Sequence, residues 1–162
     1  MKKLTIKSSE QFAKQLFGKV KSAEDKEIFL AHMKQVRETA LILAEKRKVD
    51  RKTLVIAANL HDIGRTISSE DHAFHSVNIL KKSGFRVDSK LEDCILNHGS
   101  SKKPKTVEGK IIKTADKLCW IEPGVLRFFL KYNKKRIKKA DVRFLEDKFK
   151  KIIKFLEHSE IR

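Results

Sequence analysis

The stretch DRKTLVIAANLHDIGRT, residues 50–66, decides how this chain folds. Asp50 is a good N-cap, and residues 54–60 are nearly all apolar. A helix that is apolar on every side is covered on every side, so this one is predicted to form the centre of the protein. The apolar run nevertheless ends on two polar residues, His61 and Asp62, which need partners inside a core.

The rest of the chain is also predicted to be helical, because apolar residues recur at steps of three and four and only KLTI, residues 3–6, could be extended. Helix starts are predicted at side chains that can cap them: Ser8, Ser22, Ser68 or Ser69, Asp88 and Thr106. Helix ends are expected at Gly64, Gly84 and Gly99, and a last amphipathic helix at about 140–157. With no repeat and no linker, we predict one all-α domain, a compact multi-helix bundle over residues 1–162.

Composition limits the class of protein. No apolar run approaches the roughly 20 residues needed to cross a bilayer, so no membrane association is predicted. The start, MKKLTIKSSE, turns polar before an apolar segment develops, so no secretory signal is expected and the cytoplasm is the default location. Cys94 and Cys119 are too few for a disulfide framework and are interpreted as small core residues.

The net charge of +17 would attract polyanions. The lysines are spread along the whole chain, however, with one concentration at KYNKKRIKK, residues 131–139, where Tyr132 alone offers base stacking. A solvated basic surface in a heat-adapted host explains the charge equally well. We therefore expect an anionic ligand but not a dedicated reader of nucleic acid.

Further histidines and a carboxylate fall on inward faces of other predicted helices: His32, His75, His98 and Asp116. Buried imidazoles and carboxylates are costly unless a partner supplies compensating charge, and a divalent cation is the strongest such partner. A cluster of nitrogen and oxygen ligands suits Mn, Fe, Co, Ni or Zn, with Mg also possible. The pattern predicts a central metal site, which the family resemblance described next extends to one or two ions.

The order His32, LHDIGR (60–65) and TADKL (114–118) resembles the H…HD…D pattern of the HD-domain superfamily of metal-dependent phosphohydrolases, over about residues 29–120. Three flanking segments are also similar to the family: HMKQVRETALILAE, HAFHSVNILKKSGF and CILNHGS. The resemblance implies an all-α bundle of HD-domain type around a metal. It assigns the first metal to His32, His61, Asp62 and Asp116, lets Asp62 bridge to a second metal, and matches His75 and His98 to second-metal ligands.

The same resemblance implies hydrolysis of a phosphate ester of a nucleotide or related small phosphate compound by metal-activated water, with Asp62 as a catalytic residue. Arg65 is the first candidate for the cation that binds the substrate and stabilises the phosphoryl charge, although a surface arginine at a helix end explains it equally well. Lys117 is a weaker candidate because it points about 100° away from Asp116 on a helix. His72 is expected at the rim of the site, and His158 at the surface.

The sequence departs from some family members and leaves two alternatives open. It lacks a Glu-Asp pair soon after His61 and a Gly-Tyr-Pro signature, so guanosine-tetraphosphate and cyclic-dinucleotide hydrolysis lose support, and NHGS (97–100) holds one histidine where several binuclear members have two. One alternative is a di-iron oxygenase, which requires both His75 and His98 as ligands. The other is a non-catalytic protein with a structural metal whose basic surface binds RNA or DNA.

Overall fold

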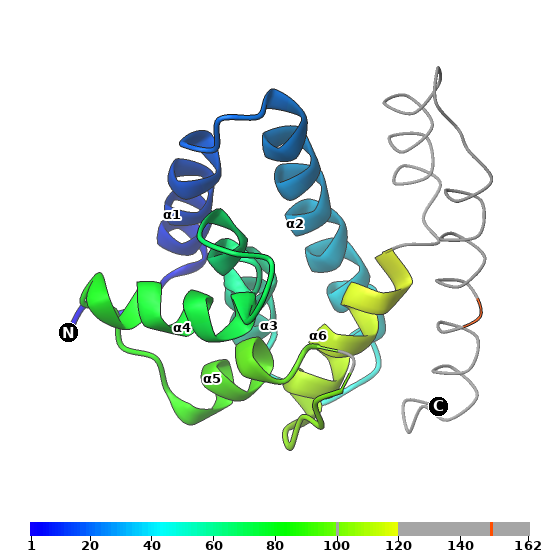
Figure 1. The fold of residues 1–162 in the computed structure, drawn as a ribbon. Helices are drawn as coiled ribbons and strands as arrows, with labels where there is room; N and C mark the ends of the chain where they lie inside the picture. Colours follow the sequence, from blue (N-terminus) through cyan, green and yellow to red (C-terminus); the bar gives the residue numbers. More distant parts are fainter. Residues whose placement is uncertain (100, 120–149, 151–162) are drawn as a thin grey trace.

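The protein is seen in a computed structural model that describes residues 1–99, 101–119 and 150. These residues form α1 (Ile6–Gly18), α2 (Ala23–Leu43), α3 (Arg51–Leu60), the 3-10 helix η1 (Ile63–Thr66), α4 (His72–Lys82), α5 (Ser89–Leu96) and α6 (Val107–Leu118) (Figure 1). Within the described residues the extended pairing is one isolated parallel bridge between Lys2 and Phe85, so KLTI does not form a strand. The predicted all-α architecture is confirmed.

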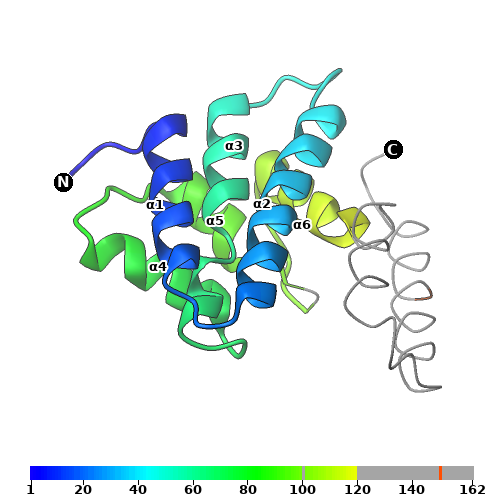
Figure 2. The same cartoon turned by 90° about the horizontal axis from the view of Figure 1, so that it is seen from above.

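Helix α3 is the centre of the bundle, as its composition predicts. Its residues from Thr53 to Leu60 are all buried. The helix packs against α1, α2, α5 and α6, and Figure 2 shows it between α1 and α2. Its first turn is capped by Asp50, whose side chain accepts hydrogen bonds from the backbone N–H of Thr53 at 3.1 Å and from its hydroxyl at 2.8 Å. The covered helix therefore carries its last residues directly into the core.

Most helix starts follow the predicted caps. The side chains of Ser22, Asp88 and Thr106 each accept a hydrogen bond from the backbone N–H three residues later, at the starts of α2, α5 and α6. The first helix differs, because Thr5 caps it. Ser8 lies within its first turn and hydrogen-bonds back to Thr5 in a reciprocal capping box.

The boundaries around α4 differ more. The helix begins after Asp71, which has a φ of 49° and no capping side-chain bond, and not after Ser68 or Ser69. The reason is η1, a turn that continues past α3 and carries the chain to residue 68 before α4 can start. Gly84, with a φ of 78°, follows the end of α4 as predicted. Gly64 and Gly99, by contrast, do not end helices, because α3 ends at residue 60 and α5 at residue 96.

Both cysteines lie in the core, Cys94 with 0% and Cys119 with 1% of its surface exposed, and burial raises the pKa of Cys94 to about 12. No helix among the described residues is both long and apolar enough to cross a membrane. The predicted helix at about 140–157, the basic segment 131–139 and His158 lie outside the described residues, so the extent of the domain stays a prediction.

Candidate metal centre

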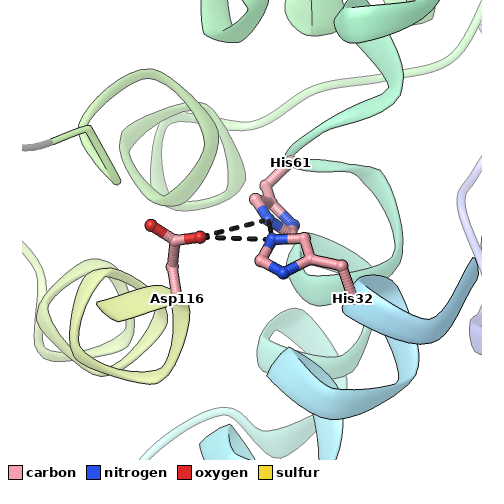
Figure 3. A group of neighbouring side chains, drawn as sticks. All are labelled: His32, His61 and Asp116. Atoms are coloured by element: carbon pink, nitrogen blue, oxygen red, sulfur yellow. Dashed lines mark hydrogen bonds and ion pairs between the residues drawn. The ribbon is translucent and has the colours of Figure 1, made fainter. Parts of the chain in front are cut away.

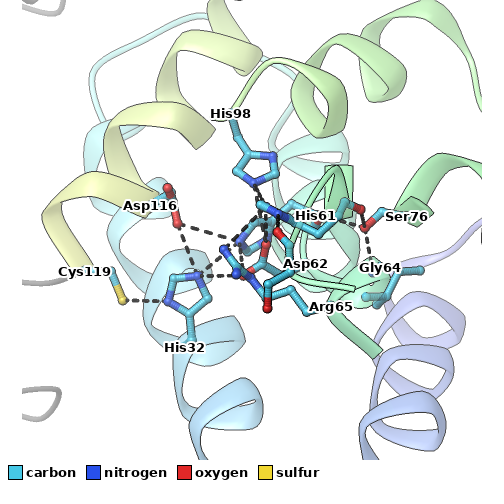
Figure 4. Close-up of polar contacts among 12 residues, drawn as sticks. His32, His61, Asp62, Gly64, Arg65, Ser76, His98, Asp116 and Cys119 are labelled. Atoms are coloured by element: carbon cyan, nitrogen blue, oxygen red, sulfur yellow. Dashed lines mark hydrogen bonds and ion pairs between the residues drawn. The ribbon is translucent and has the colours of Figure 1, made fainter. Parts of the chain in front are cut away.

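All of the predicted ligands except His75 meet where five elements converge (Figure 4). His32 comes from the middle of α2 and Asp116 from the last turn of α6, while His61 and Asp62 follow the last residue of α3. His98 follows α5, and the first residue of α4, His72, completes the set. These side chains are buried or half-buried, with only 1% of His61 and of His98 exposed. The site therefore depends on the packing of the whole bundle.

The first donor group consists of His32, His61 and Asp116, whose side chains point toward one another in Figure 3. The Nε2 atoms of the two imidazoles lie 3.2 Å apart. The Oδ1 atom of Asp116 lies 3.2 Å from Nε2 of His32 and 3.9 Å from Nε2 of His61. One ligand atom from each residue lies within 4.8 Å of the others, so the three can hold one divalent ion.

The second donor group consists of His72, His98 and Oδ1 of Asp62. The two Nε2 atoms lie 3.0 Å apart, and they lie 3.2 Å (His72) and 3.5 Å (His98) from that oxygen. The other oxygen of Asp62, Oδ2, turns to the first group, at 3.4 Å from Nε2 of His32 and 3.8 Å from Nε2 of His61. Asp62 thus lies between the two groups with one oxygen toward each, which is the arrangement a bridging carboxylate requires.

Three of the imidazoles are oriented by backbone carbonyls, each three residues earlier in the chain. Nδ1 of His61 donates to the carbonyl of Ala58 at 2.9 Å. Nδ1 of His98 and of His72 donate in the same way to the carbonyls of residues 95 and 69, at 2.6 Å and 2.9 Å. Because a carbonyl only accepts, Nδ1 carries the proton, and in the neutral ring Nε2 presents a lone pair. This is how histidines that bind metals are commonly held.

Two features of the second donor group fit a cation. The Nε2 atoms of His72 and His98 face each other at 3.0 Å, and in two neutral rings protonated at Nδ1 these atoms would direct lone pairs at each other unless a proton or a metal cation lies between them. Oδ1 of Asp62 is buried and has no hydrogen-bond partner among the described residues, which is costly for a carboxylate oxygen. A divalent ion would satisfy all three atoms, so the residues present fit the metal that the sequence predicts.

The pKa shifts of His61, Asp62 and Asp116 favour the protonation states in which these side chains bind metals. Burial lowers the pKa of His61 to about 4, although the negative charge of Asp62 acts to raise it, so the ring of His61 is neutral at pH 7. Burial alone would raise the pKa of Asp62 and of Asp116. Nearby histidines outweigh the effect of burial. The charge of His61 lowers the pKa of Asp62 most, a hydrogen bond from His32 lowers the pKa of Asp116 most, and both pKa values lie well below their usual range.

His32 and His98 retain protons more strongly than ordinary histidines. Burial lowers both pKa values, but hydrogen bonds to Asp116 and Cys119 raise that of His32 well above its usual range, and the nearby carboxylate of Asp62 raises that of His98. A proton therefore competes with a metal ion at these two rings, and metal binding releases it.

Arg65 reaches the site from η1. Its Nε donates to Oδ2 of Asp62 at 2.6 Å, and its Nη2 lies 3.4 Å from Nε2 of His72. With 31% of its side chain exposed, it lies at the edge of the centre and not out on the surface. The ammonium group of Lys117 lies 3.8 Å from Oδ2 of Asp116, closer than the helix geometry alone suggested. Both predicted cations therefore lie beside the donor groups.

The structure does not bring His75 into either donor group. Its β-carbon packs against the backbone at Gly64, and its ring lies 6.2 Å from that of Phe74. His72, expected only at the rim, takes the predicted place of His75. The buried residues of α4 are Ser76, Val77 and Leu80. Ser76 and Leu80 lie four and eight residues after His72, and this spacing was the signal that could have placed His72 on the inward face.

Sequence reasoning also missed the partner of His32. Its Nδ1 lies 3.3 Å from Sγ of Cys119, whereas His61, His72 and His98 use backbone carbonyls. Cys119 directly follows the last residue of α6, three residues after Asp116, so both can face α2. The apolar spacing that placed Cys119 in the core could not show that the core at that point contains a histidine.

Comparisons with known proteins agree with this geometry. The HD domain family matches residues 29–121. Ribonuclease Y of Desulforudis audaxviator is 30% identical over 115 residues, covering 69% of this chain and 22% of that protein. The tRNA (cytidine(56)-2'-O)-methyltransferase of Picrophilus torridus is 28% identical over 143 residues, covering 76% of this chain and 41% of that protein. The chain thus spans less than half the length of these curated relatives.

A crystal structure of a predicted HD superfamily hydrolase from an uncultured Thermotogales bacterium superposes with a TM-score of 0.62 and 24% identity, over 93% of this chain and 88% of that one. At that identity the likeness shows the fold alone. The family match, however, covers all of the residues that meet at the centre, from His32 to Cys119. The chain therefore belongs to the HD domain family.

Proposed function

We propose that this chain is a metal-dependent phosphohydrolase that cleaves a phosphate ester of a nucleotide or a related small phosphate compound. The observation that carries the proposal is the position of Asp62, a buried carboxylate with Oδ1 beside His72 and His98 and Oδ2 beside His32 and His61. Nitrogen and oxygen donors in this arrangement suit divalent transition metals. The ligand sets are the two donor groups, bridged by Asp62.

When bound, such ions polarise a phosphoryl oxygen and lower the pKa of water. The chain's own residues bind and orient the substrate around them. The guanidinium of Arg65, held against Asp62 and partly exposed, is placed to donate hydrogen bonds to the phosphoryl oxygens, where negative charge grows during the reaction. Lys117 supplies a second positive charge beside Asp116. Buried carbonyls behind the rings, such as that of Ala58, keep the donor atoms in place.

The proposal is tested with protein reconstituted with Mn, Ni, Co or Mg and offered nucleoside mono-, di- and triphosphates and cyclic nucleotides. We expect release of phosphate or nucleoside that EDTA and His61→Ala abolish. Elemental analysis of protein purified without a metal-affinity tag gives the number of ions per chain. Protein that is metal-free as purified and gains no activity with any of these ions would contradict the proposal.

A second candidate substrate is a phosphodiester of RNA. Burial and the positive charges of Lys117 and Lys103 lower the pKa of Lys113, so these three lysines, on α6 and the loop before it, are near enough for their charges to interact. Because Lys117 lies beside Asp116, this cluster adjoins the metal centre and suits a strand with several phosphates. Two of the relatives, ribonuclease Y and the tRNA methyltransferase, are also named for RNA.

This candidate predicts metal-dependent cleavage of a labelled single-stranded RNA, with affinity that falls steeply as salt increases. Charge removal at Lys103 and Lys117 (both to Gln) should weaken binding. The matched control is Lys19 and Lys21 (both to Gln), exposed residues in the turn between α1 and α2, which Figure 1 shows at the top of the molecule, away from α6. Equal losses in both variants would indicate attraction by the overall charge and not by this cluster.

The di-iron alternative requires iron in both donor groups, with His72 in the place predicted for His75. Elemental analysis combined with an iron-specific spectrum separates it from phosphohydrolysis, because the oxygenase requires two iron ions per chain, whereas the phosphohydrolase works with other divalent metals.

A further inference from the structure

The contact between α4 and η1 is unusually close at Gly64. A β-carbon at this position would lie 2.0 Å from the carbonyl oxygen of His72, 2.6 Å from the backbone nitrogen of Ser76 and 2.8 Å from the β-carbon of His75. Such distances are impossible for real atoms, so the first turn of α4 packs directly on the backbone of η1. Only glycine permits this packing, which brings the start of α4 against the end of α3.

One side chain, that of Ser76, joins the backbone segments at this contact. Its Oγ accepts a hydrogen bond from the N–H of Gly64 at 2.8 Å. The same hydroxyl lies in donor geometry 2.8 Å from the carbonyl of His61 and 2.9 Å from that of His72, and its single proton is shared between them (Figure 4). Ser76 is completely buried, so water cannot replace it.

The two carbonyls belong to residues of different donor groups. His61 is a member of the first group, and His72 is a member of the second. The hydroxyl of Ser76 therefore ties the backbone of one group to the backbone of the other. A shift of α4 away from η1 would carry His72 with it. His32 and Asp116 lie on α2 and α6 and His61 directly follows α3, so these three would stay in place.

We propose that Ser76 is a positioning residue that sets the distance between the two donor groups and thereby controls binding of the second metal ion. This inference rests on the proposed function, because it takes the two groups as metal sites. Ser76 touches neither substrate nor ion in this proposal and acts through His72. Partners behind metal ligands typically change affinity about 10- to 100-fold when they are removed, which is the effect expected here.

The test compares Ser76→Ala with Ser9→Ala. Ser9 is the matched control because it is also completely buried, and its hydroxyl also both donates and accepts, but on α1: it donates to the carbonyl of Ile6 at 2.8 Å and accepts from Nδ2 of Asn59 at 3.0 Å. Mn²⁺ alone is titrated into each protein without substrate, and bound ions are counted by electron paramagnetic resonance. Ser76→Ala should bind the first ion as the wild type does and the second about 10- to 100-fold more weakly. Ser9→Ala should bind both ions normally.

A double variant checks that the effect passes through His72. In a His72→Gln background, the further change Ser76→Ala should cause no additional loss of Mn²⁺ affinity, because the ligand it positions is already gone. If Ser76→Ala does not fold, Ser76→Cys, whose thiol is a weaker partner in the same place, should show the same selective loss.

The proposal is overturned by unchanged binding in Ser76→Ala, by equal weakening of both ions, by a similar loss in Ser9→Ala, or by a wild-type protein that binds one ion. Because ions are counted without substrate, a failure of hydrolysis does not affect this result. Conversely, an active enzyme with normal metal binding in Ser76→Ala would refute only the role of Ser76.

Discussion

Asp93 offers a sharp test of how the start of α6, and with it Asp116, is held in place. Its carboxylate accepts hydrogen bonds from the backbone N–H groups of Lys105 at 3.0 Å and Thr106 at 2.8 Å, from the hydroxyl of Thr106 at 2.5 Å, and from the amide of Asn97 at 2.8 Å. Only 8% of Asp93 is exposed. The residue therefore joins α5 to the loop that leads into α6.

The expected cost of Asp93→Ala follows from these contacts. The hydroxyl of Thr106 and the amide of Asn97 can turn to other partners, but the two backbone N–H groups cannot. A hydrogen bond to a charged group contributes about 1.5 to 3 kcal/mol, so the loss of two at the lower value should reduce the free energy of unfolding by about 3 kcal/mol. Urea unfolding followed by circular dichroism at pH 7 measures this loss.

The effect should also depend on pH. Burial raises the pKa of Asp93, but hydrogen bonds from Thr106 and Lys105 outweigh it and hold the pKa below its ordinary value. A carboxyl whose pKa is lower in the folded protein stabilises it above the unfolded pKa, and this contribution is lost as the pH falls through the folded value. The difference between wild type and Asp93→Ala should therefore narrow below about pH 4.

The matched control is Asp25→Ala, an exposed carboxylate in the first turn of α2, which should cost only about 0.5 kcal/mol through its interaction with the helix dipole. A loss of less than about 1 kcal/mol in Asp93→Ala at pH 7, or a difference from wild type that is constant from pH 3 to pH 7, would refute the reasoning, because neither fits buried bonds to a charged group.

Three further predictions concern the centre itself. His72→Ala should abolish binding of the second ion, counted by elemental analysis, while His75→Ala leaves the count unchanged; the reverse result would restore the ligand set read from the sequence. Arg65→Gln should lower kcat/KM about 10²- to 10³-fold with the number of bound ions unchanged, and a loss of ions would show that Arg65 serves the site and not the substrate. Because the pKa values of His32 and His98 are raised, protons compete with the metal, so Mn²⁺ affinity measured by titration should increase from pH 6 to pH 8; a flat profile would contradict these shifts.

What the sequence could predict was mostly local. Asp50 and Thr106 cap helices through hydrogen bonds to residues three positions later, so their role can be predicted from a segment of only four residues. The central position of α3 could also be predicted, because its residues from Thr53 to Leu60 leave no side of the helix facing solvent. The meeting of His32, His61 and Asp116 could also be predicted, because these residues lie within helices or at a helix end, where spacing indicates the face.

The errors at the centre have a tertiary cause. Gly64 has the sequence pattern of a helix stop, but it lies in η1, where its missing side chain admits the backbone of α4. That contact decides that His72 and not His75 faces Asp62. The start of α4 was hidden as well, because Asp71, the residue before it, has a left-handed backbone and makes no capping bond that a sequence would reveal. Spacing along one helix cannot show where another helix touches it.

The carbonyl bonds behind His61, His72 and His98 have a consequence for the kinetics of metal exchange. Each ring is oriented by a carbonyl only three residues away, in its own stretch of chain, so its direction is set once the local backbone has formed. The donor atoms are therefore already oriented when an ion arrives, and ordering them costs little binding free energy. The rates of metal binding and release should therefore be set by how fast solvent and ions pass the partly exposed side chain of Arg65, and should not require the helix bundle to open.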